Sequence, residues 1–385
     1  MNRIIFIFLL VLLVSCQQKT KKIRDESTDI TGMVKKEDFQ GTHKEEQTDL
    51  ITIKNVNGLI LQVTNYGGKI VTLFVPDKDG NMGDIVFGYE NIQEYLDGNR
   101  SFGAIVGRYA NRIAAGTFAL DGIQYQLPLN EGGKNTLHGG NSGFDDAVWN
   151  AEKINSAEGE AVKLILQSPD GDQGFPGNLT VEVIYTLTDN DELIVDYKAV
   201  TDKPTVINLS QHSYFNLAGH ASGSILDHEL MINADKFTPV NKNLIPTGEF
   251  RSVEGSPFDF RTPHKIGERI DDENEQLKIG RGYDHNFILN KETPGDLSLA
   301  ASVFENSTGR FMEVFTTHPA IQLYTGNFLD GSAMGKGNVA YNLRTGFCLE
   351  TQHYPDSPNH PEFPSTVLRP GEEYKHRTIF KFSVK

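Results

Sequence analysis

Glu350 stands at the end of a short apolar run, where a carboxyl group could take up and release protons. Residues 346–349 predict a buried strand, and the proline- and asparagine-rich residues 355–359 predict a turn that leads the chain away. Desolvation raises the pKa of a carboxyl group, which suits it to proton transfer near neutral pH. A solvent-facing glutamate on an edge strand would show the same pattern, so the other polar clusters must decide.

His212 lies in a second cluster, residues 208–217, in which apolar side chains bracket hydrogen-bonding ones. With an ordinary pKa of about 6.5, a histidine can act as an acid near neutral pH. Ser213 and Tyr214 follow it directly, and a tyrosine offers an aromatic face with a polar tip that suits a sugar ring. The cluster therefore indicates proton transfer beside a polyhydroxylated ligand.

Two arginines and an asparagine interrupt the small and apolar residues 103–114. An arginine in such a setting needs carboxylate, carbonyl or hydroxyl partners. We expect Arg108 to serve the fold, and Asn111 and Arg112 to bind a ligand. Further along, His138 precedes two glycines, which allow a ligand or another strand to approach the backbone closely.

Two more polar positions complete the set. Asp284 lies in residues 281–287 and offers a bidentate acceptor for hydroxyl groups, although an aspartate here could equally form a turn. Gln322 interrupts an apolar strand and could be a core amide or a ligand contact.

Several function classes are excluded by missing motifs. The sequence has no P-loop, no dinucleotide-binding fingerprint, no zinc-binding His-Glu-x-x-His helix, no Cys-x-x-Cys pair and no Gly-x-Ser-x-Gly nucleophile elbow. The net charge of −15 argues against nucleic acid as a partner. The remaining side chains suit sugar hydroxyls and proton transfer without a cofactor or a metal.

Alternation with a period of two dominates the chain and predicts the elements that position these residues. Residues 59–66 read as a strand, residues 117–120 and 123–127 as a hairpin around Asp121 and Gly122, and residues 181–187 and 193–200 as another. Residues 311–316 and 321–325 flank a turn at His318 and Pro319. Only residues 91–96 and 265–277 suggest helices, so we predict an all-β antiparallel sandwich or barrel.

The N-terminus carries a targeting signal. Arg3, the apolar residues 4–14 and the sequence up to Cys16 resemble a bacterial lipobox, so we expect a signal peptide over residues 1–15 and a lipid on Cys16. Residues 17–37 are polar and read as a flexible tether, which leaves residues 38–385 as the catalytic domain. Cys348 then has no partner for a disulfide. The expected location is a bacterial cell envelope, with the protein anchored to a membrane and facing the periplasm or the surface.

Together the clusters resemble the aldose 1-epimerase (galactose mutarotase) family. The matching motifs occur in the family's order at residues 65–68, 107–113, 137–140, 212–217, 283–287, 322–328 and 350–359. The resemblance implies a large antiparallel β-sandwich of the galactose mutarotase type, with few short helices, that interconverts the anomers of free aldoses such as galactose and glucose for hexose metabolism.

The resemblance also implies residue roles. Glu350 matches the general base of the family and His212 its general acid. The substrate-binding positions are Asn111, Arg112, His138, Asp284 and Gln322, together with Ser213 and Tyr214 from the same motif as His212. No cofactor is required; some relatives bind a structural calcium ion, for which the sequence shows no loop. We expect a monomer.

Two alternatives remain open. A carbohydrate-binding lipoprotein without turnover would need the same sugar contacts, but no acid/base pair. A glycoside hydrolase usually employs two carboxylates, and Asp284 could be the second. A sugar-phosphate epimerase fits the motifs less closely.

Overall fold

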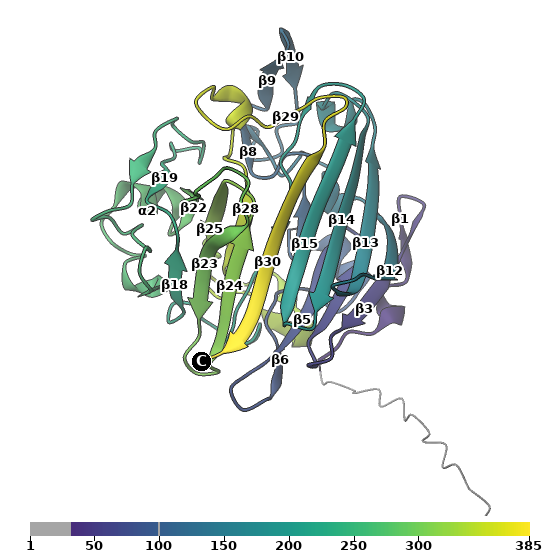
Figure 1. Ribbon diagram of the computed structural model, residues 1–385, viewed down its shortest axis with the longest axis vertical. Coiled ribbons are helices and arrows are strands. Elements are labelled where there is room, and N and C mark those ends of the chain that lie inside the picture. Colours follow the sequence, from purple (N-terminus) through teal and green to yellow (C-terminus); the bar gives the residue numbers. More distant parts are fainter. Residues whose placement is uncertain (1–31, 99–100) are drawn as a thin grey trace, which may run out of the picture. The chain divides into compact units, whose positions relative to one another are not determined.

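A nine-stranded antiparallel sheet forms one layer of the fold and faces the viewer in Figure 1. The computed structural model describes residues 32–98 and 101–385. In spatial order the strands of the sheet are β12 (Asn150–Asn155), β13 (Gly159–Ser168), β14 (Leu179–Thr188), β15 (Glu192–Thr201), β30 (Tyr374–Val384), β24 (Arg310–Thr316), β23 (Ser298–Phe304), β18 (Glu229–Ile232) and β21 (His264–Lys265). Along β24 buried and half-buried residues alternate, so one face of this sheet points into the core.

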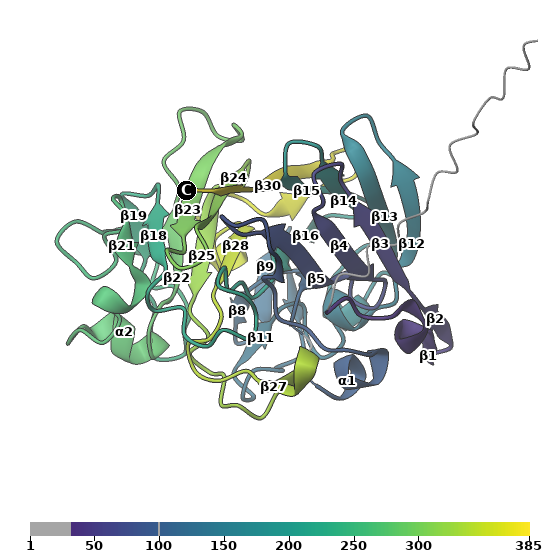
Figure 2. The same cartoon turned by 90° about the horizontal axis from the view of Figure 1, so that it is seen from below.

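Two smaller sheets pack on that face (Figure 2). One contains β20 (Arg251–Ser252), β19 (Lys236–Thr238), β22 (Asp284–Ile288), β25 (Ala320–Tyr324) and β28 (Cys348–Gln352). The other contains β3 (Leu50–Lys54), β4 (Ile60–Thr64), β5 (Lys69–Pro76) and β6 (Met82–Asp84). Side chains of all three sheets, among them Leu73, Val183 and Leu349, form one continuous apolar core.

Short strand pairs and helices complete the fold. The strand pairs are β1 (Gly41–His43) with β2 (Glu46–Thr48), β7 (Ala104–Val106) with β17 (Ser210–His212), β8 (Arg112–Ala114) with β11 (Asn135–Leu137), β9 (Thr117–Leu120) with β10 (Ile123–Gln126), β16 (Thr205–Val206) with β29 (Val367–Leu368), and β26 (Met334–Gly335) with β27 (Val339–Ala340). The α-helices among the described residues are α1 (Ile92–Asp97) and α2 (Glu275–Gly280). The single 3₁₀ turns are Lys36–Phe39, Phe144–Asp146, Asp172–Gly174, Ile266–Glu268, Lys336–Asn338 and Ser357–Asn359. The predicted all-β antiparallel class is confirmed.

Most predicted elements are present. The pair β9 and β10 turns at Asp121 and Gly122, and β14 pairs with β15 as expected. The helical stretch predicted at 265–277 is broken into a 3₁₀ turn and α2. The turn at His318 and Pro319 does not close a hairpin, because β24 belongs to the nine-stranded sheet and β25 to the five-stranded one. This connection therefore carries the chain from one layer of the sandwich to the other.

The signal peptide and Cys16 lie outside the described residues. The end of the expected tether is ordered onto the fold, since the side-chain amide of Gln62 accepts a hydrogen bond from Val34 N–H and donates one to Val34 O, both at 3.0 Å. The folded unit thus begins before residue 38. Within the described residues, no helix has both the length and the apolar character needed to cross a membrane.

Candidate active site

The polar face of the five-stranded sheet forms the floor of the site. Strand geometry turns alternate side chains to opposite faces, and the register pairs Gln322 on β25 with Glu350 on β28. Their neighbours Leu323 and Leu349 point the other way, into the main core. Glu350 was predicted at the end of its strand, but β28 continues to Gln352 and holds this carboxylate in mid-strand, where it is only 3% exposed.

His212 reaches Glu350 from another strand. It ends β17, where it pairs with Ala104 of β7, and is 4% exposed. Its Nε2 lies 3.6 Å from Oε1 of Glu350, and its Nδ1 lies 3.6 Å from Sγ of Cys348. The imidazole therefore faces the carboxyl group with one nitrogen and a buried thiol with the other.

The pairing of β8 with β11 brings Asn111, Arg112 and His138 close to one another. Arg112 opens β8 and pairs with Leu137 at the end of β11, so Asn111 and His138 lie just outside the pair. The N–H of Asn111 donates to Nδ1 of His138 at 3.1 Å, and the N–H of His138 donates to the carbonyl of Asn111 at 3.0 Å. Because Nδ1 accepts, the hydrogen of the neutral His138 ring lies on Nε2. Ring or carboxylate atoms of His138, His212 and Glu350 lie within 4.8 Å of one another.

These residues line a pocket of about 140 Å³. Its lining consists of Ser101, Asn111, Arg112, Leu137, His138, His212, Tyr214, Asp284, Tyr324, Phe328 and Glu350. Phe328 is 48% exposed and stacks on Tyr324 with ring centroids 6.2 Å apart, so the pocket has an aromatic wall of the kind that sugar rings pack against. Two predicted binding residues, Ser213 and Gln322, are buried beside the pocket and are not part of its lining.

Burial drives the acid/base pair toward its uncharged forms. It raises the pKa of Glu350 to about 8, helped by the carboxylate of Asp284 and opposed by the charge of Arg112. Burial also lowers the pKa of His212 to about 4. The sequence had suggested a histidine near its ordinary pKa, which this desolvated position does not give. Between about pH 4 and about pH 8 the pair therefore shares one proton.

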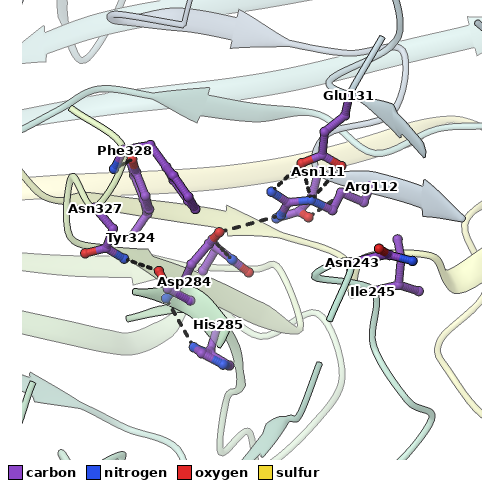
Figure 3. Close-up of polar contacts among 12 residues, drawn as sticks. Asn111, Arg112, Glu131, Asn243, Ile245, Asp284, His285, Tyr324, Asn327 and Phe328 are labelled. Carbon is purple, nitrogen blue, oxygen red and sulfur yellow. Dashed lines mark hydrogen bonds and ion pairs between the residues drawn. The ribbon is translucent and has the colours of Figure 1, made fainter. Parts of the chain in front are cut away.

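Arg112 lies between two carboxylates (Figure 3). Its Nε donates to Glu131 Oε1 at 2.8 Å, and its Nη2 lies 2.7 Å from the same oxygen. On the other side, Nη1 lies 3.7 Å from Oδ2 of Asp284. The Oδ1 atom of Asp284 accepts a hydrogen bond from Nε2 of Gln322 at 2.6 Å. Burial raises the pKa of Asp284, and Arg112 and Gln322 counteract this effect.

The site does not fit calcium. Among the described residues, the side chains that gather closely enough to hold a metal ion are His138, His212 and Glu350. Calcium takes six to eight oxygen ligands, and this set offers two imidazoles and one carboxylate. The set also includes Glu350 and His212, the predicted base and acid, so we assign no metal here.

The expectations for the flanking residues can be compared with the structure. Arg108 does serve the fold, but it bonds to carbonyls and hydroxyls, among them Pro176 O at 2.8 Å and Ser168 Oγ at 2.5 Å. The expected salt bridge is not found within residues 32–98 and 101–385. A Cβ atom on Gly139 would overlap the carbonyl of Gly107, so the glycines after His138 do allow a close backbone approach.

Sequence reasoning missed several residues of the site, among them Glu131, Cys348 and Phe328. Glu131 comes from a loop that the pairing of β8 and β11 brings back to Arg112. The contact of Cys348 with His212 joins two strands that are 136 residues apart. Phe328 had been quoted only as the end of a motif. The alternation along residues 346–350 could have placed Cys348 and Glu350 on one face, whereas no sequence signal marked Glu131.

Comparisons with known proteins agree with this geometry. The family model of aldose 1-epimerases matches residues 49–381. Galactose mutarotase from Bos taurus is 46% identical over 326 residues, which cover 85% of this chain and 92% of the bovine protein. Aldose 1-epimerase from Escherichia coli K12 is 39% identical over 335 residues, which cover 86% of this chain and 94% of that protein.

Solved structures show the same fold. An aldose epimerase homologue from C. elegans superposes with a TM-score of 0.80 at 32% identity and covers 88% of this chain and 99% of its own. Galactose 1-epimerase from Lactobacillus acidophilus gives a TM-score of 0.78 at 31% identity and covers 89% of this chain and 97% of its own. The galactose mutarotase type of β-sandwich is thereby confirmed, and the chain belongs to the aldose 1-epimerase family.

Proposed function

We propose that this isomerase interconverts the α and β anomers of free aldoses such as galactose and glucose, with Glu350 as base and His212 as acid. The observation that carries the proposal is the buried pair itself, whose nearest N···O distance is 3.6 Å and which shares one proton around neutral pH. A protein that only binds sugar has no need of such a pair, because burying it costs free energy.

Ring opening needs one proton removed and one supplied. In the reactive form the shared proton lies on His212 and Glu350 is ionised. Oε2 of Glu350 is buried without a partner among the described residues, so it can then accept the proton of the C1 hydroxyl. The O1 electron pair then forms the C1=O1 double bond, the bond from C1 to the ring oxygen breaks, and His212 protonates that oxygen. Rotation about C1–C2 presents the other face of the aldehyde, and the reverse transfers close the ring. The pair ends with the single proton it began with.

The remaining residues hold the sugar in this proposal. Arg112, through Nη1, and His138, through its Nε2 hydrogen, polarise the ring oxygen and fix the ring. Asp284 accepts hydroxyl hydrogens, and Tyr214 packs against the sugar. Asn111 keeps the His138 ring in its tautomer through the bond to Nδ1.

Gln322 and Ser213, which do not line the pocket, contribute from behind it. Gln322 supports Asp284 through their 2.6 Å hydrogen bond, and its Oε1 is buried without a partner among the described residues. The hydroxyl of Ser213 is also buried and has no partner within the part of the chain that the structure describes.

Polarimetry tests the proposed activity. Freshly dissolved α-galactose and α-glucose should reach anomeric equilibrium faster in the presence of the enzyme, and a methyl galactoside, whose C1 hydroxyl is blocked, should stay intact. Release of methanol from the glycoside would favour a hydrolase that uses Asp284 as its second carboxylate. Binding of aldoses without any acceleration would favour the carbohydrate-binding lipoprotein.

We also propose that the enzyme is a monomeric lipoprotein of the bacterial envelope, tethered through Cys16. A lipid anchor places the folded unit at a membrane surface without a spanning helix. Cells expressing the full chain should therefore incorporate labelled fatty acid into the protein and carry it in the membrane fraction, and Cys16→Ser should abolish the label and release the protein. Membrane association that survives Cys16→Ser would contradict the lipid anchor. Light scattering of detergent-solubilised protein should give one chain per particle.

A further inference from the structure

We propose that Glu131 is a positioning residue of the active site. It orients the guanidinium of Arg112 toward the pocket, and its negative charge weakens the electrostatic effect of Arg112 on Glu350. The inference rests on the proposed epimerase function and adds a residue that no family motif marked. Glu131 does not line the pocket, so it would act entirely through Arg112.

The geometry of the pair fixes the direction of the guanidinium. The carboxylate of Glu131 binds the edge of the Arg112 guanidinium formed by Nε and Nη2. Nε of Arg112 lies 2.8 Å from Oε1 and 3.0 Å from Oε2 of Glu131. A bidentate pair of this kind locks the plane of an arginine as well as its position. The Nη1 edge is left toward Asp284 and the pocket (Figure 3), which is the edge a sugar oxygen would meet.

Glu131 is itself held rigidly. Its Oε2 accepts a hydrogen bond from Nδ2 of Asn135 at 3.0 Å, and its N–H donates to the carbonyl of Asn135 at 3.1 Å. Nδ2 of Asn135 also donates to the carbonyl of Asn243 at 3.2 Å. The turn before β11 is thereby tied to a neighbouring loop. The side chain of Glu131 is 26% exposed, so its pairing with Arg112 costs less desolvation than a fully buried ion pair would.

The charges around Glu350 give this arrangement a second consequence. The groups that face Glu350 are His212, His138, Cys348, Tyr214, Tyr324, Asp284 and Arg112. Arg112 is the one permanent cation among them, and its charge favours the ionised form of Glu350. The negative charge of Glu131 offsets part of that field. Without the charge of Glu131, Glu350 would lose its proton at a lower pH. The upper limit of the pH range in which Glu350 and His212 share one proton would then fall.

Two substitutions separate the aiming of Arg112 from the charge effect. Glu131→Gln removes the charge and keeps most of the shape, so the alkaline limb of the kcat/KM profile should move down by roughly half a pH unit and KM should rise severalfold. Glu131→Asp keeps the charge and shortens the reach, so KM should rise while the alkaline limb stays in place. Glu158→Gln is the matched control, because Glu158 also pairs with an arginine, Arg377, with N···O distances of 3.1 and 3.2 Å, and does not line the pocket.

A titration of the Glu350 carboxyl carbon by ¹³C NMR gives a readout that does not depend on turnover. The Glu350 signal is identified by its absence in Glu350→Gln, and its midpoint should be lower in Glu131→Gln than in the wild type. An unchanged midpoint together with an unchanged KM, or an equal shift in Glu158→Gln, would overturn the proposal. An inactive wild type would count against the epimerase function alone, since the titration still reports on Glu131. If Glu131→Gln does not fold, the KM of Glu131→Asp decides, and a wild-type value overturns the inference.

Discussion

Glu350→Gln is expected to lower kcat for galactose and glucose by about a hundredfold to ten-thousandfold, with sugar affinity close to that of the wild type. The amide has the shape of the protonated carboxyl group and resembles the form that burial favours around neutral pH. Unlike the carboxyl group, the amide cannot ionise and accept the proton of the C1 hydroxyl. The variant should therefore still bind the sugar but should not catalyse the reaction. Calorimetric titration of galactose beside polarimetry separates the two quantities. Glu158→Gln, the same exchange on a distant strand connection, serves as control, and normal turnover in Glu350→Gln would remove this residue from the mechanism.

The same substitution should change how stability depends on pH. The folded protein keeps the proton on Glu350 up to about pH 8, whereas an unfolded glutamate releases it near pH 4.5. Folding therefore takes up a proton between these values, and the contribution of this raised pKa to stability is present below pH 4.5 and lost as the pH rises through 8. Relative to Glu350→Gln, the wild type should lose up to about 1.4 kcal/mol of unfolding free energy per pH unit in this window. Denaturant unfolding at pH 5.5 and 7.5 measures the difference, and parallel slopes would contradict the raised pKa.

His212→Asn should lower kcat by about a hundredfold to ten-thousandfold as well, and adding it to Glu350→Gln should cost little more. The two residues hand one proton back and forth, so removing either interrupts the same cycle. Asparagine keeps hydrogen-bonding capacity and cannot supply a proton to the ring oxygen.

His353→Asn is the matched control for the His212 variant. Burial lowers the pKa of His353 to about 4, as it does for His212, and His353 lies outside the pocket lining. We expect the control to keep its activity. Losses that multiply in the double variant would show that Glu350 and His212 act independently and would refute the shared proton.

The sequence predicted the fold because alternation is a local property. The hairpins at β9–β10 and β14–β15 follow from a turn signal between two alternating runs, and nothing distant disturbs them. The connection between β24 and β25 has the same local pattern, yet its two strands enter different layers. Which layer a strand joins depends on packing against partners far away in the chain, and a local pattern does not carry that information.

The candidate site was predicted in part for a similar reason. Motifs pointed to Glu350, His212 and Arg112, whose chemistry is visible in their residue types. Their pKa values depend on burial and on neighbours from other strands, so an ordinary pKa for His212 was the natural expectation and was wrong. Glu131 reaches Arg112 only because β8 pairs with β11, and a glutamate in a glycine-rich loop gives no sign of that contact.

Exchange NMR at anomeric equilibrium tests the central claim most directly. With glucose and the wild-type enzyme, the H1 signals of the α and β anomers should show exchange cross-peaks whose build-up rate rises in proportion to enzyme concentration. Glu350→Gln and His212→Asn, folded and at the same concentration, should leave only the spontaneous rate. Cross-peaks that build up as fast with Glu350→Gln as with the wild type would contradict the account, because the anomers would then interconvert without the carboxylate on which the mechanism depends.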